Sequence, residues 1–179
     1  TFFNIMKPKV GDRRIMGLCI IIPGIIDAHS HANSVGMQQT VANLYAPPDG
    51  KVINISSLLN ELKDWAQKNP DFVQATSGWI MGNGYDDAEL QEKRHPTADE
   101  LDLVSKDQPV LILHQSGHLA SANHKALELL NINADTQNPE GGVIRRVAGS
   151  TVPNGVLEES AVIQAMMTAF KTVPPEVME

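Results

Sequence analysis

The feature that most constrains the fold of this chain is an apolar, β-branched run that ends in two closely spaced histidines. The run comprises Cys19–Ile22 and Ile25–Ile26, and after Asp27 it leads into His29 and His31. Such a segment is typical of a strand buried in a parallel sheet. Side chains two residues apart on a strand point to the same face, so we expect the two imidazoles to project together. Two neutral imidazoles supply half of a tetrahedral zinc site.

The histidine pair also has a plainer interpretation. Two imidazoles at a strand end can simply hydrogen-bond to backbone groups, and two ligands alone hold a metal ion weakly. Asp27 likewise fits either a carboxylate that orients a ligand or a cap of the strand end. A metal centre built on His29 and His31 therefore needs at least one further ligand from elsewhere in the chain.

The rest of the chain alternates between helical and extended patterns, which predicts an α/β fold. Apolar periodicity predicts a helix over 56–69 that ends at Pro70, and a last helix over 158–171. Thr97 and Glu100 have the spacing of a capping box, and Asn123 is a helix cap. The remaining expected elements are strands over 79–83, 109–114 and 143–146, a hairpin at Gly117 leading into 118–121, and short helices over 97–104 and 123–130.

Several further motifs follow the histidine pair in a recognisable order. They are Gly78–Asp86, His114–His118, Pro139–Gly142 and Asn154–Glu159. Together with Pro23–His31, this order resembles the amidohydrolase superfamily, and within it the family 3 branch, which includes enzymes similar to N-substituted formamide deformylases. The resemblance runs from about Pro23 to about Ala161.

The resemblance implies a (β/α)8 barrel with a small β-sandwich beside it, and such a barrel needs roughly 250 residues. This chain has 179 residues, and none of its six histidines lies after His124. In the family, further histidine ligands and a catalytic aspartate come from later barrel strands. We therefore expect a divergent N-terminal segment over 1–18 and, over 19–179, a partial barrel truncated relative to the whole enzyme. We also expect little or no activity from this chain alone.

The same resemblance implies metal-dependent hydrolysis of a non-peptide C–N bond in a small amide or formamide, with zinc as the expected ion. His29 and His31 would hold this ion, and Glu159 would be the third ligand, because a carboxylate can bridge two divalent cations. The alternative for Glu159 is a surface residue in the first turn of a helix, where the helix dipole favours a negative charge.

His114 and Tyr85 are the candidate substrate-binding residues. His114 lies in a strand-and-turn segment from which an imidazole can face a cleft, and Tyr85 can line a polar pocket. The alternative for His114 is a structural histidine that fixes the hairpin. The neighbouring polar residues are assigned structural positions: the hairpin for His118, helix flanks for His95 and His124, and a turn for Asp86 and Asp87.

Charge and cysteine content narrow the class of protein. The net charge of −7 argues against nucleic acid or an anionic membrane as the main partner. The single cysteine, Cys19, excludes an internal disulfide and suits a cytoplasmic protein. Basic residues over 7–14 precede the apolar run as in a secretory leader, but the Pro-Gly interruption favours a barrel strand. No apolar segment reaches the roughly 18 residues that span a bilayer.

A second hypothesis belongs to a different functional class. An interrupted barrel exposes apolar strand edges, which tend to pair with another copy of the chain. The chain would then be a non-catalytic, self-associating α/β module derived from a hydrolase, and a homo-oligomer is expected in either case. Metal content and oligomeric state distinguish the two hypotheses.

Overall fold

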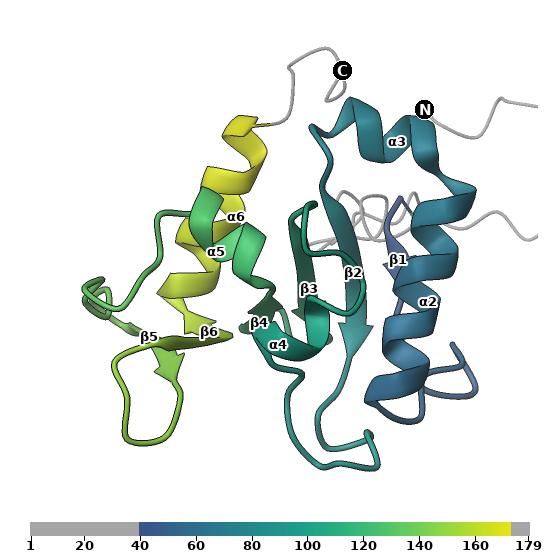
Figure 1. Ribbon diagram of the computed structural model, residues 1–179. Coiled ribbons are helices and arrows are strands. Elements are labelled where there is room, and N and C mark those ends of the chain that lie inside the picture. The colour runs from purple at the N-terminus through teal and green to yellow at the C-terminus, as the bar shows by residue number, and fades with distance from the viewer. Residues whose placement is uncertain (1–39, 173–179) are drawn as a thin grey trace, which may run out of the picture. The chain divides into compact units, whose positions relative to one another are not determined.

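The structure is a computed structural model and describes residues 40–172 (Figure 1). The expected divergent segment over 1–18, the expected strand over 19–28, and both His29 and His31 lie outside the described residues. Sequence-based expectations for these parts of the chain therefore stay predictions.

The described residues form one six-stranded sheet in the order β1-β2-β3-β4-β6-β5. Its strands are β1 (Ala42–Asn43), β2 (Ile80–Tyr85), β3 (Val110–His114), β4 (Leu119–Ala122), β5 (Gly142–Arg146) and β6 (Pro153–Glu159). Strands β1, β2 and β3 are parallel, β4 is antiparallel to both β3 and β6, and β5 is antiparallel to β6. Strand β6 therefore runs in the direction of β2 and β3. We call the edge at which β2, β3 and β6 end and β4 begins the carboxyl edge.

Five helices accompany these strands within the described residues, four between strands and α6 after the last strand, which confirms the α/β class. They are α2 (Ile55–Lys68), α3 (Pro70–Ala75), α4 (Ala98–Leu101), α5 (His124–Leu129) and α6 (Ser160–Thr172). None of these helices is long and apolar enough to cross a membrane. That the sheet is part of a barrel stays a prediction.

Local sequence signals predicted most of these elements correctly. Helix α2 agrees with the expected range, 56–69. The capping box that begins at Thr97 and the helix cap at Asn123 are both present. Pro70 does more than end α2, because after a break at Asn69 it occupies the first turn of α3. Proline is tolerated there, since the first helical residues need no amide hydrogen for an intrahelical bond.

Strand β6 is the main departure from the sequence-based expectation. The sequence predicted a turn-rich stretch to Pro153 and a helix from residue 158, whereas Pro153–Glu159 is a strand and α6 begins at Ser160. Strand β6 is hydrogen-bonded to β4 on one side and β5 on the other. The alternative that Glu159 sits in the first turn of a helix is therefore wrong.

Two apolar clusters pack against opposite faces of the sheet. Neighbouring residues of β3 point to different faces, so Ile112 belongs to one cluster and Leu111 to the other. The first cluster includes Leu58 and Leu62 of α2, and the second includes Ala165 of α6. Figure 1 shows α2 on one side of the sheet and α5 and α6 on the other. The packed faces leave the carboxyl edge as the place where polar side chains gather.

The buried amide of Asn123 joins three parts of the fold. Its Oδ1 accepts hydrogen bonds from the backbone N–H of Val110, at 2.9 Å, and of Ala126, at 2.8 Å. Its Nδ2 donates to the carbonyls of Ser105, at 2.8 Å, and Gln108, at 3.0 Å. One side chain thus fixes the start of β3, the first turn of α5 and the loop before β3.

Replacing Asn123 with alanine leaves four backbone groups without these partners, in a site that is fully buried. We expect Asn123→Ala to lower the free energy of unfolding by about 2–4 kcal/mol. Urea denaturation measures this loss. The matched control is Asn60→Ala, because Asn60 is exposed on α2 and its replacement should cost no more than about 0.5 kcal/mol. Equal effects of the two substitutions would contradict the role of Asn123.

Gly84 sets the direction of the chain at the end of β2. Its φ is +101°, and an added Cβ would lie 2.5 Å from the ring of Tyr45. The register between β2 and β3 shifts between Asn83 and Tyr85, so that Tyr85 pairs with His114. A left-handed residue at such a bulge is normally glycine, because a side chain there is strained.

We expect Gly84→Ala to destabilise the fold by at least about 2 kcal/mol, because backbone strain adds to the clash with Tyr45. Gly149→Ala is the matched control. Gly149 also has a positive φ, +72°, but no atom lies within 4 Å of the added Cβ, so only strain of about 1 kcal/mol is expected. Thermal or urea unfolding of both variants checks the difference, and a Gly84→Ala loss no larger than that of Gly149→Ala would refute the close approach of Tyr45.

Candidate functional site

The carboxyl edge of the sheet collects the chemically reactive side chains of the described residues. Parallel strands place their final residues side by side, and ligand sites of α/β folds lie at such edges. Asp86 and Asp87 follow β2, His114 ends β3, His118 precedes β4, and Glu159 ends β6. The topology of the sheet thus brings together residues that are up to 73 positions apart in the sequence (159 − 86 = 73).

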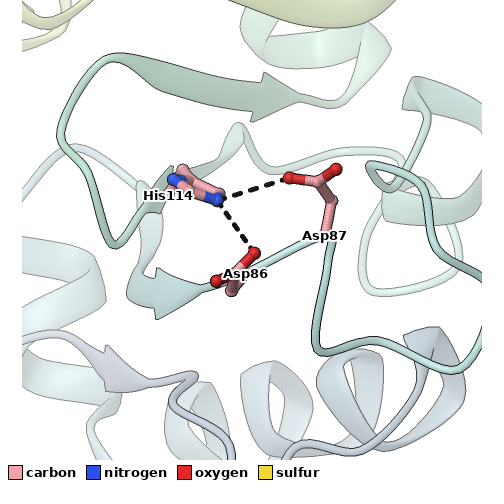
Figure 2. A group of neighbouring side chains, drawn as sticks. All are labelled: Asp86, Asp87 and His114. Atoms are coloured by element: carbon pink, nitrogen blue, oxygen red, sulfur yellow. Dashed lines mark hydrogen bonds and ion pairs between the residues drawn. The ribbon is translucent and has the colours of Figure 1, made fainter.

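Asp86, Asp87 and His114 form a compact group (Figure 2). The Nε2 atom of His114 lies 3.4 Å from an Oδ1 atom of each aspartate. One ligand atom from each residue can be chosen so that all three lie within 4.8 Å of one another. The imidazole is 9% exposed, and the carboxylates of Asp86 and Asp87 are 15% and 33% exposed. The group is therefore partly shielded, yet open to solvent on the side of Asp87.

Hydrogen bonds hold two of these side chains in place. Asp86 accepts from the backbone N–H of Ala88, at 2.8 Å, and from the side-chain amide of Gln115. The Nδ1 atom of His114 lies 2.9 Å from the hydroxyl oxygen of Ser116 and 3.1 Å from its backbone nitrogen. The backbone N–H of Ser116 can only donate to Nδ1, whereas its hydroxyl can donate or accept, so these contacts favour a ring proton on Nε2, which faces the two carboxylates.

A buried polar network lies behind this group. The hydroxyl of Tyr85 lies 3.2 Å from Nδ1 of His95 and 3.3 Å from the hydroxyl of Ser121. Its ring meets the ring of His114 edge to face, with centroids 5.3 Å apart. Burial raises the pKa of Tyr85 and lowers the pKa of His95, so that both are neutral near pH 7. The same Nδ1 of His95 is 3.7 Å from Asp87, which links the network to the group at the edge.

His118 and Glu159 form a second pair on the carboxyl edge. Nδ1 of His118 lies 2.8 Å from Oε2 of Glu159, and both side chains are more than half exposed. The backbone N–H of Glu159 donates to the carbonyl of His118, at 2.8 Å, and the φ of Glu159 is +53°. A left-handed conformation costs a non-glycine residue about 1–3 kcal/mol and is often found at functional sites.

The structure revises several assignments made from the sequence, and it places five of the residues considered there on the carboxyl edge: Asp86, Asp87, His114, His118 and Glu159. Tyr85 is fully buried, and its ring contacts His114. His95 was expected merely to flank a helix, but it is buried against Tyr85. His124 does flank a helix, where it pairs with Asp102 at 2.8 Å. His29 and His31 are outside the described residues, so their role stays a prediction.

Asp86 and Asp87 were assigned to a turn, and their proximity to His114 was missed. The missing signal was the end of β2, which was expected at residue 83 and lies at Tyr85. With its end at residue 85 instead of 83, the predicted strand would have been followed directly by both aspartates. Acidic residues at that position are candidates for a ligand site.

The buried state of His95 predicts a pH dependence of stability. The folded chain keeps His95 neutral at pH values where the unfolded chain already protonates it, because burial lowers its folded pKa. The unfolded state then binds more protons, so the free energy of unfolding should fall as the pH drops below about 6.5. The titration of His95 can change the free energy of unfolding by at most about 1.4 kcal/mol per pH unit.

Urea denaturation of the wild type and His95→Asn, from about pH 7.5 to about pH 5, isolates this contribution. The variant keeps a polar side chain near Tyr85 but cannot titrate in this range, so its slope should be the flatter one. Identical slopes would mean that His95 titrates alike in the folded and unfolded chains.

Comparison with known proteins agrees with these features. The model of the amidohydrolase family matches residues 19–179. The chain is 30% identical to N-substituted formamide deformylase of Arthrobacter pascens and to protein LONG AFTER FAR-RED 3 of Arabidopsis thaliana, in both cases over 79% of this chain. It spans 24% and 22% of the length of these two relatives. A crystal structure of an uncharacterized metal-dependent hydrolase from Pyrococcus horikoshii OT3 matches 83% of this chain and 24% of its own, with 27% identity and a TM-score of 0.53. The chain therefore belongs to the amidohydrolase family.

Proposed function

We propose that this chain is part of a metal-dependent hydrolase that acts on a non-peptide C–N bond of a small amide or formamide. Membership of the amidohydrolase family supports hydrolysis, and the deformylase relative supports the amide or formamide class. The observation that carries the proposal is the alignment of histidine and carboxylate side chains at the ends of β2, β3 and β6. The chain covers about a quarter of that relative, at 24%.

We propose His29, His31 and Glu159 as the ligands of the catalytic ion. The histidines come from the sequence motif, and the geometry of Glu159 suits the role. Its carboxylate is exposed at the carboxyl edge, and its backbone is fixed by the hydrogen bond to the carbonyl of His118. Imidazole and carboxylate donors suit zinc, which is the proposed ion. When bound, such an ion lowers the pKa of a coordinated water and polarises the substrate carbonyl.

The remaining residues of the edge have positioning roles in this proposal. His118 holds the carboxylate of Glu159 through the 2.8 Å contact. His114 is proposed to face the substrate, and Tyr85, which is fully buried, acts on the substrate through the ring of His114. Fixed side chains of this kind lower the reorganisation needed during catalysis.

Metal content tests the proposed centre without needing a substrate. We expect the purified 179-residue chain to retain zinc after dialysis, and the His29→Ala/His31→Ala double variant to lose at least half of it, because two of three ligands are gone. Glu159→Gln should weaken retention about 10–100-fold. Elemental analysis measures all three. A double variant that retains the wild-type amount of zinc would contradict the assignment of the histidines.

We further expect this chain alone to hydrolyse formamides slowly or not at all, because it spans 24% of the deformylase that it resembles. A panel of N-substituted formamides and simple amides, assayed with zinc present, measures this activity. Turnover by the wild type that is lost in the His29→Ala/His31→Ala variant would contradict the expected inactivity while supporting the ligands.

The alternative function, a non-catalytic and self-associating module, has one structural feature in its favour. Ile163 and Met167 lie one turn apart on α6 and are 61% and 58% exposed. Exposed apolar side chains of this kind mark interaction surfaces. If a homo-oligomer forms through α6, analytical ultracentrifugation of Ile163→Glu/Met167→Glu should show single chains, whereas the control Gln164→Glu should stay associated. A wild type that sediments as one chain would contradict this alternative.

A further inference from the structure

We propose that Asp86, Asp87 and His114 bind a divalent cation of their own, of the zinc or manganese type. It uses none of the ligands proposed for the catalytic ion, His29, His31 and Glu159, so it can be tested on its own. It uses three side chains from the ends of two adjacent parallel strands, all drawn toward one point in Figure 2.

The spacing of the donor atoms fits two ligands of one cation as well as it fits the long hydrogen bond between His114 and Asp86. Nε2 of His114 lies 3.4 Å from Oδ1 of Asp86 and 3.4 Å from Oδ1 of Asp87. Hydrogen bonds between nitrogen and oxygen are usually about 2.9 Å long. Two ligands bound to one ion at about 2.1 Å and a tetrahedral angle lie about 3.4 Å apart. The imidazole is therefore spaced from both carboxylates as a ligand sharing an ion with them would be.

Binding an ion requires Nε2 of His114 to present a lone pair. A neutral histidine binds a cation through one ring nitrogen while the other nitrogen donates its proton to a neighbour. The backbone N–H of Ser116 donates to Nδ1 at 3.1 Å, which favours a ring proton on Nε2, so ion binding moves this proton to Nδ1, where the Ser116 hydroxyl, 2.9 Å away, can accept it. The ring is 9% exposed and packs edge to face on Tyr85. Binding at Nε2 therefore needs no rotation of His114.

Among the described residues, no lysine or arginine forms an ion pair with Asp86 or Asp87. In the described part of the chain, the ion pairs of Asp86 and Asp87 are all with histidines, His95 and His114. Two adjacent carboxylates without a lysine or arginine partner repel each other, and a divalent ion relieves that repulsion.

The donor set also limits which ions fit. One imidazole nitrogen and two carboxylate oxygens suit zinc and manganese, whereas calcium and magnesium favour oxygen ligands alone. Asp86 is further oriented by Ala88 and Gln115, as ligands of transition ions usually are by their neighbours. Water would complete the coordination, since Asp87 is 33% exposed.

Isothermal titration of the full 179-residue chain with zinc or manganese tests the site. We expect the isosteric double variant Asp86→Asn/Asp87→Asn to lose one binding event or to weaken it by about 100-fold or more, while the His29→Ala/His31→Ala variant keeps that event. The control is Asp99→Asn, because Asp99 is an acidic residue that is 89% exposed. Unchanged binding in the double variant, or the loss of all binding in the histidine variant, would overturn the proposal. Failure of the proposed catalytic centre would instead leave the histidine variant identical to the wild type.

A second measurement uses only the wild-type chain, so it holds even if a variant fails to fold. Manganese at substoichiometric levels broadens the nuclear magnetic resonance signals of groups near the bound ion. The ring protons of His114 should broaden before those of His124, the exposed histidine that begins α5. Broadening of His124 first, or of both rings equally, would contradict binding at Asp86, Asp87 and His114.

Discussion

The bulge at Gly84 is the constraint on which the carboxyl edge depends. With a φ of +101° and the ring of Tyr45 against its Cα, this residue shifts the register so that Tyr85 pairs with His114. Without that shift, alternation along β2 would turn Tyr85 to the other face of the sheet. The aromatic contact with His114, and the position of the aspartates that follow Tyr85, both result from this one backbone conformation.

Buried polar side chains occur at both edges of the sheet, and the fold tolerates them because each has a partner. In the part of the chain that the structure describes, no buried side-chain nitrogen or oxygen lacks a hydrogen bond. The amide of Asn123 binds four backbone groups, and Tyr85 is bound by His95 and Ser121. Satisfied networks of this kind fix a single arrangement of side chains, and that is what a binding site requires.

Local chemistry in the sequence was sufficient to predict most of the elements, since caps and periodicity depend on neighbouring residues. Helix α2, the hairpin at Gly117 and the cap at Asn123 are of this kind. Strand β6 was missed because its stability comes from pairing with β4 and β5, whose residues lie up to 39 positions before their partners in β6 (158 − 119 = 39). Likewise His114 was recognised as a site residue, but its distance to Asp86 and Asp87 follows from the parallel pairing of β2 and β3, which no local pattern specifies.

Anomalous X-ray diffraction from crystals grown with zinc most directly tests whether the carboxyl edge binds metal. We predict an anomalous peak among Oδ1 of Asp86, Oδ1 of Asp87 and Nε2 of His114, about 2.0–2.2 Å from each atom. A crystal that contains zinc elsewhere but shows no peak at this edge would contradict the central claim.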